Sequence, residues 1–135
     1  MAVQAEILAD RWGREKREGR APDPGGILCR AGHVSLHVDP GGDVTPCAAW
    51  PLVLGNVRTD GLRGVLASGA LASVRRLRHR ERSACRDCDR LPWCGFCPGQ
   101  GYAIAGNPLA PSPYSCEQAE VRRLACAIVA GEDVR

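Results

Sequence analysis

The chain has 135 residues, enough for one domain, and carries 18 Lys and Arg against 15 Asp and Glu, a formal charge of +3. So small a charge gives no reason to expect nucleic acid as a partner. With 16 glycines, 10 prolines and a single phenylalanine, the chain is too rich in turn formers to build a large core, which favours a fold that depends on metal.

The N-terminal segment, residues 1–20, is predicted to be a helix with a small apolar stripe, ended by Gly19. Residues 21–28 are a linker by their proline and glycine content. The helix would join the chain to a preceding domain or dock on a partner. This segment is too highly charged to contain the apolar region of a secretory signal. The chain also has no stretch of about 20 apolar residues, the length needed to cross a membrane. We therefore expect a cytoplasmic protein whose cysteines bind metal.

A β-hairpin is expected next. Residues 33–38 alternate between apolar and polar side chains, residues 39–42 (Asp-Pro-Gly-Gly) form a turn, and residues 43–45 begin a return strand. Cys29 and Cys47 lie just outside these strands. The hairpin would bring both thiols, separated by 17 residues in sequence, to the same open end.

Helical spacing of leucine and valine follows the hairpin. Thr59 or Asp60 can cap a helix that begins near Gly61, and Ser68-Gly69 is expected to break it in two. The preceding dipeptide Gly55-Asn56 is interpreted as a turn.

The C-terminal half is predicted as a loop followed by one helix. Residues 85–97 are interpreted as a cysteine-rich loop wrapped around metal, and residues 99–101 as a turn. Residues 115–118 (Ser-Cys-Glu-Gln) have the pattern of a capping box that opens a last helix. The expected apolar stripe of that helix contains Val121, Leu124, Ala125, Ile128 and Val129. The expected fold class is thus a small, irregular α+β domain that depends on a metal cluster.

Seven of the eight cysteines form one ordered pattern: Cys29, Cys47, Cys85, Cys88, Cys94, Cys97 and Cys116. Seven thiols are too many for one tetrahedral ion and suit two sites built from several thiolates, holding zinc or iron–sulfur clusters. A zinc site on the four cysteines between positions 85 and 97 is the structural alternative. It would leave the other three thiols unexplained.

The order C-x12-G-x4-C, gap, C-x2-C-x5-C-x2-C, gap, C is similar to the seven-cysteine signature of the SPASM domain, the auxiliary-cluster region of many radical SAM enzymes. Residues 39–47 resemble the family's "dGdvyPC" hairpin, and residues 54–57 its "lGN" stretch. The resemblance covers residues 29–116 and leaves residues 117–135 as a C-terminal helix and tail. It implies a SPASM/twitch-like hairpin, short helices, a cysteine-rich loop and a C-terminal helix.

Two departures from the family pattern concern the cysteines. The family usually has three residues between the cysteines of its last local pair, whereas Cys94 and Cys97 are separated by two. Some members also have a cysteine shortly before the first, and none precedes Cys29 here.

The resemblance implies two [4Fe–4S] clusters with interleaved ligands. The ligands of auxiliary cluster I would be Cys29, Cys47 and Cys97. The ligands of auxiliary cluster II would be Cys85, Cys88, Cys94 and Cys116. Cluster I would then have one iron without a protein thiolate, for which His33, His37 and Asp23 are candidates, although a solvated hairpin face explains the two histidines better. The eighth thiol, Cys126, is predicted to be a small buried hydrophobe.

The implied function is that of an auxiliary iron–sulfur domain, as a fragment or a split subunit of a radical SAM maturase. It would relay electrons and position a peptide or protein substrate, with no nucleic acid and no membrane involved. The chain lacks the Cx3Cx2C motif and should not be catalytic alone, so S-adenosylmethionine would act only through a radical SAM barrel in the same polypeptide or a separate subunit. The alternatives are a structural zinc module and a free-standing electron carrier. The arginines between Arg75 and Arg90 form either a solvated helix face or a basic surface that docks an acidic partner or offsets an anionic cluster.

Overall fold

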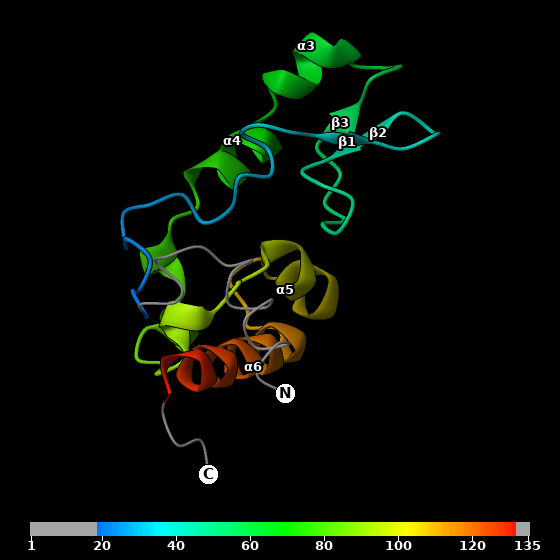
Figure 1. The fold of residues 1–135 in the computed structure, drawn as a ribbon. Coiled ribbons are helices and arrows are strands. Elements are labelled where there is room, and N and C mark those ends of the chain that lie inside the picture. Colours follow the sequence, from blue (N-terminus) through cyan, green and yellow to red (C-terminus); the bar gives the residue numbers. More distant parts are fainter. Residues whose placement is uncertain (1–18, 132–135) are drawn as a thin grey trace. The chain divides into compact units, whose positions relative to one another are not determined.

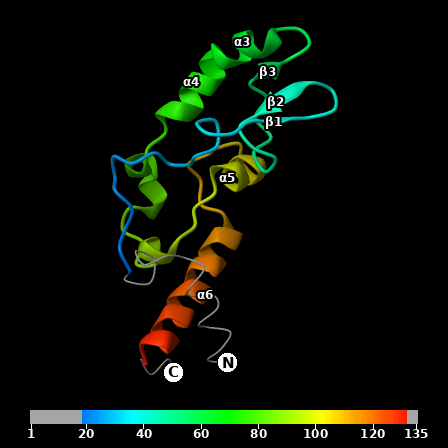
Figure 2. The same ribbon diagram turned by 45° about the horizontal axis from the view of Figure 1, so that its top comes forward.

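The computed structural model describes residues 19–131, and Figures 1 and 2 show their elements from two directions. The chain divides into two compact units, each built from segments far apart in sequence. The sheet unit contains residues 24–83 and 97–110, and the helix unit contains residues 19–23, 84–96 and 111–131 of the described chain. Among the described residues, no helix is long and apolar enough to cross a membrane. Most of the helix predicted over residues 1–20 lies outside the described part.

The predicted hairpin is present in the sheet unit. Strand β1 (His37–Val38) pairs antiparallel with β2 (Asp43–Thr45), with His37 opposite Thr45. In the turn between them, the Gly42 amide donates to the carbonyl oxygen of Asp39 at 3.0 Å, and the Asp43 amide donates to the Asp39 side chain at 3.0 Å. Gly42 has a φ of 93°, which explains why glycine is suited to the last turn position.

The first strand is shorter than predicted. Its expected first half is a turn, because the amides of His33 and Val34 both donate to the carbonyl oxygen of Arg30. Val34 is consequently 65% exposed and does not share a buried face with Leu36. Local backbone hydrogen bonding here prevails over the alternating pattern of the sequence.

A third strand was not expected from the sequence. Strand β3 (Gly55–Asn56), interpreted above as a turn, pairs antiparallel with β2 and completes a sheet of order β1-β2-β3. The Asn56 side chain donates to the Asp43 carboxylate at 2.8 Å, and its backbone amide donates to the Asp60 carboxylate at 2.8 Å. These bonds tie the end of the sheet to the start of the next helix.

Two short helices follow, with the expected break between them. Helix α3 (Gly61–Leu66) and helix α4 (Gly69–Arg76) are separated at Ser68, whose hydroxyl accepts a hydrogen bond from the Leu71 amide at 3.2 Å. Their buried side chains join the sheet and the loop after it in one core. That core contains Ala31, Val44, Trp50, Leu54, Val65, Leu71 and Val74.

Helix α5 (Pro98–Ala105) also belongs to the sheet unit and was missed in the sequence. Residues 99–101, interpreted as a turn, lie inside it. Proline at its first position suits a helix start, because that amide needs no intrahelical partner. Gly99 lies directly against the backbone of Ala49, in the loop after β2.

The helix unit is built around α6 (Pro113–Ala130), the long orange-to-red helix in Figure 1. It begins at Pro113 after the N-cap residue Ser112, so the capping box expected at residues 115–118 is wrong. Ser115 instead lies within the first turn and is buried. The predicted apolar stripe is also only partly right: Val121 and Val129 are 46% and 44% exposed. The buried positions of the helix are Ser115, Ala119, Ala125 and Cys126.

Candidate metal centre

Four cysteines line a single hollow within the helix unit: Cys85, Cys88, Cys94 and Cys116. The hollow has an empty volume of about 330 Å³, open solvent included. Within the described residues, no three His, Cys, Asp or Glu side chains have the geometry to hold a single metal ion. The four thiols thus line a hollow and are not arranged around a single metal ion.

Successive tight turns place the first three of these cysteines. The Cys88 amide donates to the carbonyl oxygen of Cys85 at 3.2 Å, and the Cys94 amide donates to that of Leu91 at 3.1 Å. The intervening Leu91 amide donates to the carbonyl oxygen of Cys88 at 3.1 Å. A chain that reverses every three residues can return several thiols to one side. The Cx2C spacing of Cys85 and Cys88 corresponds to one such turn.

The fourth thiol comes from the first turn of α6, where the Cys116 amide donates to the carbonyl oxygen of Ser112 at 3.1 Å. Ser112 and Ser115 are both buried and also line the hollow. The N-terminus of a helix carries the positive end of its dipole, which favours negative charge. The hollow is therefore suited to an anionic group held by thiolates.

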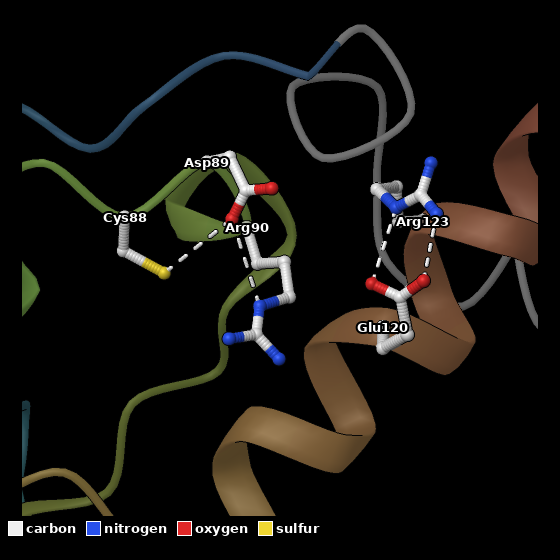
Figure 3. Close-up of polar contacts among 5 residues, drawn as sticks. All are labelled: Cys88, Asp89, Arg90, Glu120 and Arg123. Atoms are coloured by element: carbon white, nitrogen blue, oxygen red, sulfur yellow. Dashed lines mark hydrogen bonds and ion pairs between the residues drawn. The ribbon is translucent and has the colours of Figure 1, made fainter.

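One charged side chain reaches the same hollow. Arg90 lines it, and its Nε lies 3.7 Å from Oδ1 of Asp89, the oxygen to which the Cys88 thiol donates at 4.0 Å (Figure 3). The pKa of Arg90 is raised above its ordinary value, first by a hydrogen bond with Cys88 and then by the charge of that residue, with smaller effects from Asp89 and Cys116. The sequence placed Arg90 only within a run of arginines and did not mark it as part of the site.

Cys29 and Cys47 lie in the sheet unit, on either side of the hairpin as expected. Both are half-buried and pack against its core. The Ala31 amide points to the Cys29 sulfur at 3.4 Å. The carbonyl oxygen of Cys47 accepts from the Thr45 hydroxyl at 3.0 Å and from the Trp50 amide at 3.1 Å. Each cysteine is thus held in a defined backbone conformation.

Cys97 belongs to the sheet unit, although Cys94 belongs to the helix unit. It is the N-cap residue of α5, and its carbonyl oxygen accepts from the Gly101 amide at 3.2 Å. Two residues later, Gly99 contacts Ala49, which is itself two residues after Cys47. The start of α5 and the loop after Cys47 therefore pack against each other.

Three residues are alternative candidates for an additional ligand to cluster I. His33 lines a different hollow, beside Leu66 and Arg75. His37 is exposed on β1, opposite Thr45. Asp23 is exposed and belongs to the helix unit. The two histidines thus belong to the same unit as the proposed ligands of cluster I, and Asp23 does not.

All eight cysteines lie in the described part of the chain and are thiols rather than disulfides. Cys126 is buried on α6, 8% exposed, as predicted for a small hydrophobe. The arginine run is not a uniform solvated face. Arg75 donates to the carbonyl oxygen of Gly32 at 2.8 Å, and Arg82 is buried, whereas Arg86 is exposed.

Residues 29–89 match the family model of the SPASM domain, described as an iron–sulfur cluster-binding domain. The matched segment contains four of the seven patterned cysteines, and Cys94, Cys97 and Cys116 lie beyond it. No curated protein and no solved structure gives a significant match. The family match supports iron–sulfur binding, and the small α+β fold with a three-stranded sheet agrees with it. Over residues 29–89, the resemblance inferred from the cysteine spacing is confirmed, and this segment is similar to the SPASM iron–sulfur cluster-binding domain.

Proposed function

We propose that the chain holds two [4Fe–4S] clusters and serves as the auxiliary iron–sulfur domain of a radical SAM maturase that modifies a peptide or protein. Cluster II would be held by the four cysteines that line the hollow of the helix unit. Cluster I would be held by Cys29, Cys47 and Cys97 in the sheet unit. The family match to an iron–sulfur domain supports the choice of cluster over zinc.

The division of the chain into two units is the observation that carries this assignment. The boundary falls between Phe96 and Cys97, inside the second Cx2C motif. It separates Cys94 from Cys97 and leaves each proposed ligand set within one unit. A zinc site on the local run of four cysteines would need Cys94 and Cys97 to act together.

The residues around the hollow suit an anionic cluster. Thiolates are the usual ligands of four-iron clusters, and four of them give a net charge of about −2. The positive end of α6 and the cation of Arg90 oppose that charge. Such a group would supply one-electron transfer. The protein would bind it, orient it and limit its exposure to water.

Within a maturase, the domain would relay electrons and help to position the substrate. Its partner would be a radical SAM barrel, in the same polypeptide or in a separate subunit, in the cytoplasm. Because the chain has no Cx3Cx2C motif, S-adenosylmethionine would be used only by that partner. Incubation of the chain alone with S-adenosylmethionine and dithionite is expected to produce no 5′-deoxyadenosine, and production of it would contradict this assignment.

The primary test is the iron, zinc and sulfide content of protein purified without oxygen, together with its visible and EPR spectra. We expect brown protein with about eight iron and eight sulfide per chain, as two four-iron clusters require. Colourless protein that holds one or two zinc ions and takes up no sulfide on reconstitution would contradict the proposal and support a structural zinc module.

The division between clusters is tested by a matched pair of substitutions within one motif. Cys94→Ser should abolish the EPR signal of cluster II and leave cluster I, whereas Cys97→Ser should do the reverse. Identical effects of the two substitutions would contradict the interleaved assignment.

A further inference from the structure

Arg90 occupies a special place among the residues of the cluster II hollow. Within the described chain, the other residues that line the hollow are cysteines, two serines and apolar side chains, so Arg90 is the only charged one. Its side chain is 40% exposed. It therefore lies at the solvent-exposed edge of the hollow, where its positive charge would affect a group bound inside.

Arg90 lines the hollow of the four thiols and forms an ion pair with its neighbour Asp89. Its Nε lies 3.7 Å from Oδ1 of Asp89, and the Cys88 thiol donates to the same carboxylate oxygen at 4.0 Å. In Figure 3, dashed lines join Asp89 to Cys88 and to Arg90. Asp89 is 90% exposed, so solvent screens its charge more than that of Arg90. Arginine offers several N–H donors, which allows one guanidinium to contact a carboxylate and a sulfur together.

A cation at this position affects the two redox states unequally. With four thiolates, a four-iron cluster carries about −2 when oxidised and gains one more negative charge when it accepts an electron. A fixed positive charge and an N–H donor at a ligand sulfur stabilise the more negative state to a greater extent. The effect is a higher reduction potential.

We propose that Arg90 is a positioning residue of cluster II, whose positive charge at the hollow raises the reduction potential of that cluster without ligating it. This inference rests on the proposed function, because it requires a cluster at the four cysteines. It separates Arg90 from the other arginines of the run, such as Arg86, which is exposed and does not line the hollow.

The test compares Arg90→Gln with Arg86→Gln in the full chain, loaded with iron and sulfide and titrated with EPR detection. Each substitution removes one positive charge from the same loop, but only the first removes a contact with the hollow. We expect Arg90→Gln to lower the ratio of reduced to oxidised cluster II at a fixed potential by up to about tenfold, equivalent to about 59 mV for one electron. Arg86→Gln should change it little, and cluster I should be unaffected by either.

A second variant keeps the inference testable if Arg90→Gln does not bind cluster II. Arg90→Lys keeps the charge and part of the donor capacity, so it should load fully and have a potential between those of the wild type and Arg90→Gln. If Arg90→Gln fails to retain cluster II while Arg90→Lys retains it, the need for a cation at the site is supported. Equal potentials in the wild type and Arg90→Gln, or equal shifts in Arg90→Gln and Arg86→Gln, would overturn the inference. Absence of any cluster in the wild type would contradict the proposed function instead.

Discussion

Gly99 lies so close to Ala49 that a Cβ atom on Gly99 would stand 2.5 Å from the Ala49 carbonyl oxygen and 3.0 Å from the Cβ of Trp50. Both neighbours belong to the loop that follows Cys47, and Gly99 itself follows Cys97. The close approach thus connects the two segments that carry two of the proposed cluster I ligands, and any larger residue at position 99 must push them apart.

The substitution Gly99→Ala is expected to destabilise the sheet unit by about 1–3 kcal/mol, the usual cost of overpacking, and to reduce the iron of cluster I more than that of cluster II. Iron analysis and EPR of the loaded protein measure the effect. Gly69→Ala is the control, since Gly69 begins α4 without a positive φ, and a Cβ atom there would have no neighbour within 4 Å. It should be neutral or stabilising by up to about 1 kcal/mol. Unchanged loading in Gly99→Ala would show that this contact does not matter for cluster I.

Two cysteines of α6 are expected to behave oppositely. Cys116 lines the hollow, so Cys116→Ser should lose cluster II, about half of the total iron. Cys126 is buried on the same helix and does not line that hollow. Cys126→Ser should therefore keep both clusters, and its only effect should be a lower free energy of unfolding. Iron and sulfide analysis of both variants provides the measurement. Loss of iron from Cys126→Ser would refute its assignment as a packing residue.

Leu71 is fully buried in the core of the sheet unit. Leu71→Ala should destabilise the protein by about 2–5 kcal/mol through lost burial and a residual cavity. Leu62, on the neighbouring helix α3, is 57% exposed, so Leu62→Ala should change stability by only about 0.5 kcal/mol. Anaerobic urea unfolding followed by far-UV circular dichroism compares the two. Similar losses would contradict the position of the core.

Glu120 and Arg123 form an ion pair on α6, in which two guanidinium nitrogens donate to the carboxylate at 2.6 and 3.2 Å (Figure 3). This hydrogen bonding lowers the pKa of Glu120 below its ordinary value of 4.5. The folded state therefore binds this proton less readily than the unfolded chain. The contribution of the pair to stability is present above pH 4.5 and is lost as the pH falls through the lowered pKa.

Replacement of the cation checks this pH dependence. Arg123→Gln should raise the pKa of Glu120 toward its ordinary value, and high salt should have the same direction of effect in the wild type, because the pair is partly exposed. Carbon-detected NMR of the Glu120 carboxyl follows the titration. Coincident titration curves for the two proteins at low salt would show that Arg123 does not set this pKa.

The parts of the fold that were predictable from the sequence are those with local causes. The turn at Asp39–Gly42 and the break at Ser68 depend on side-chain hydrogen bonds and glycine conformation within a few residues. Strand β3 was missed because two residues carry no alternating pattern, and only pairing with β2 makes them a strand. Helix α5 was missed because glycine has a low helix propensity. Its glycines are explained by close tertiary contacts, such as that between Gly99 and Ala49, which leave no space for a side chain.

The candidate site follows the same distinction. The short spacing of Cys85, Cys88 and Cys94 predicts that their thiols can meet, and tight turns bring them to one hollow. Spacing alone cannot decide whether Cys97 joins them, since that depends on where the chain goes after Phe96. The same holds for Arg90: nothing in a run of arginines indicates which one contacts a thiol.

The interleaving of the two units has a consequence for the order of assembly during synthesis. Cys29 and Cys47 leave the ribosome well before Cys97, which is 50 residues further along the chain than Cys47. At roughly 5–20 residues per second, the early thiols wait for several seconds before their proposed third partner exists. Cys85, Cys88 and Cys94 must likewise wait for Cys116. Neither proposed ligand set is complete until its last cysteine has been made, so iron delivery to cluster II is expected to follow synthesis of Cys116.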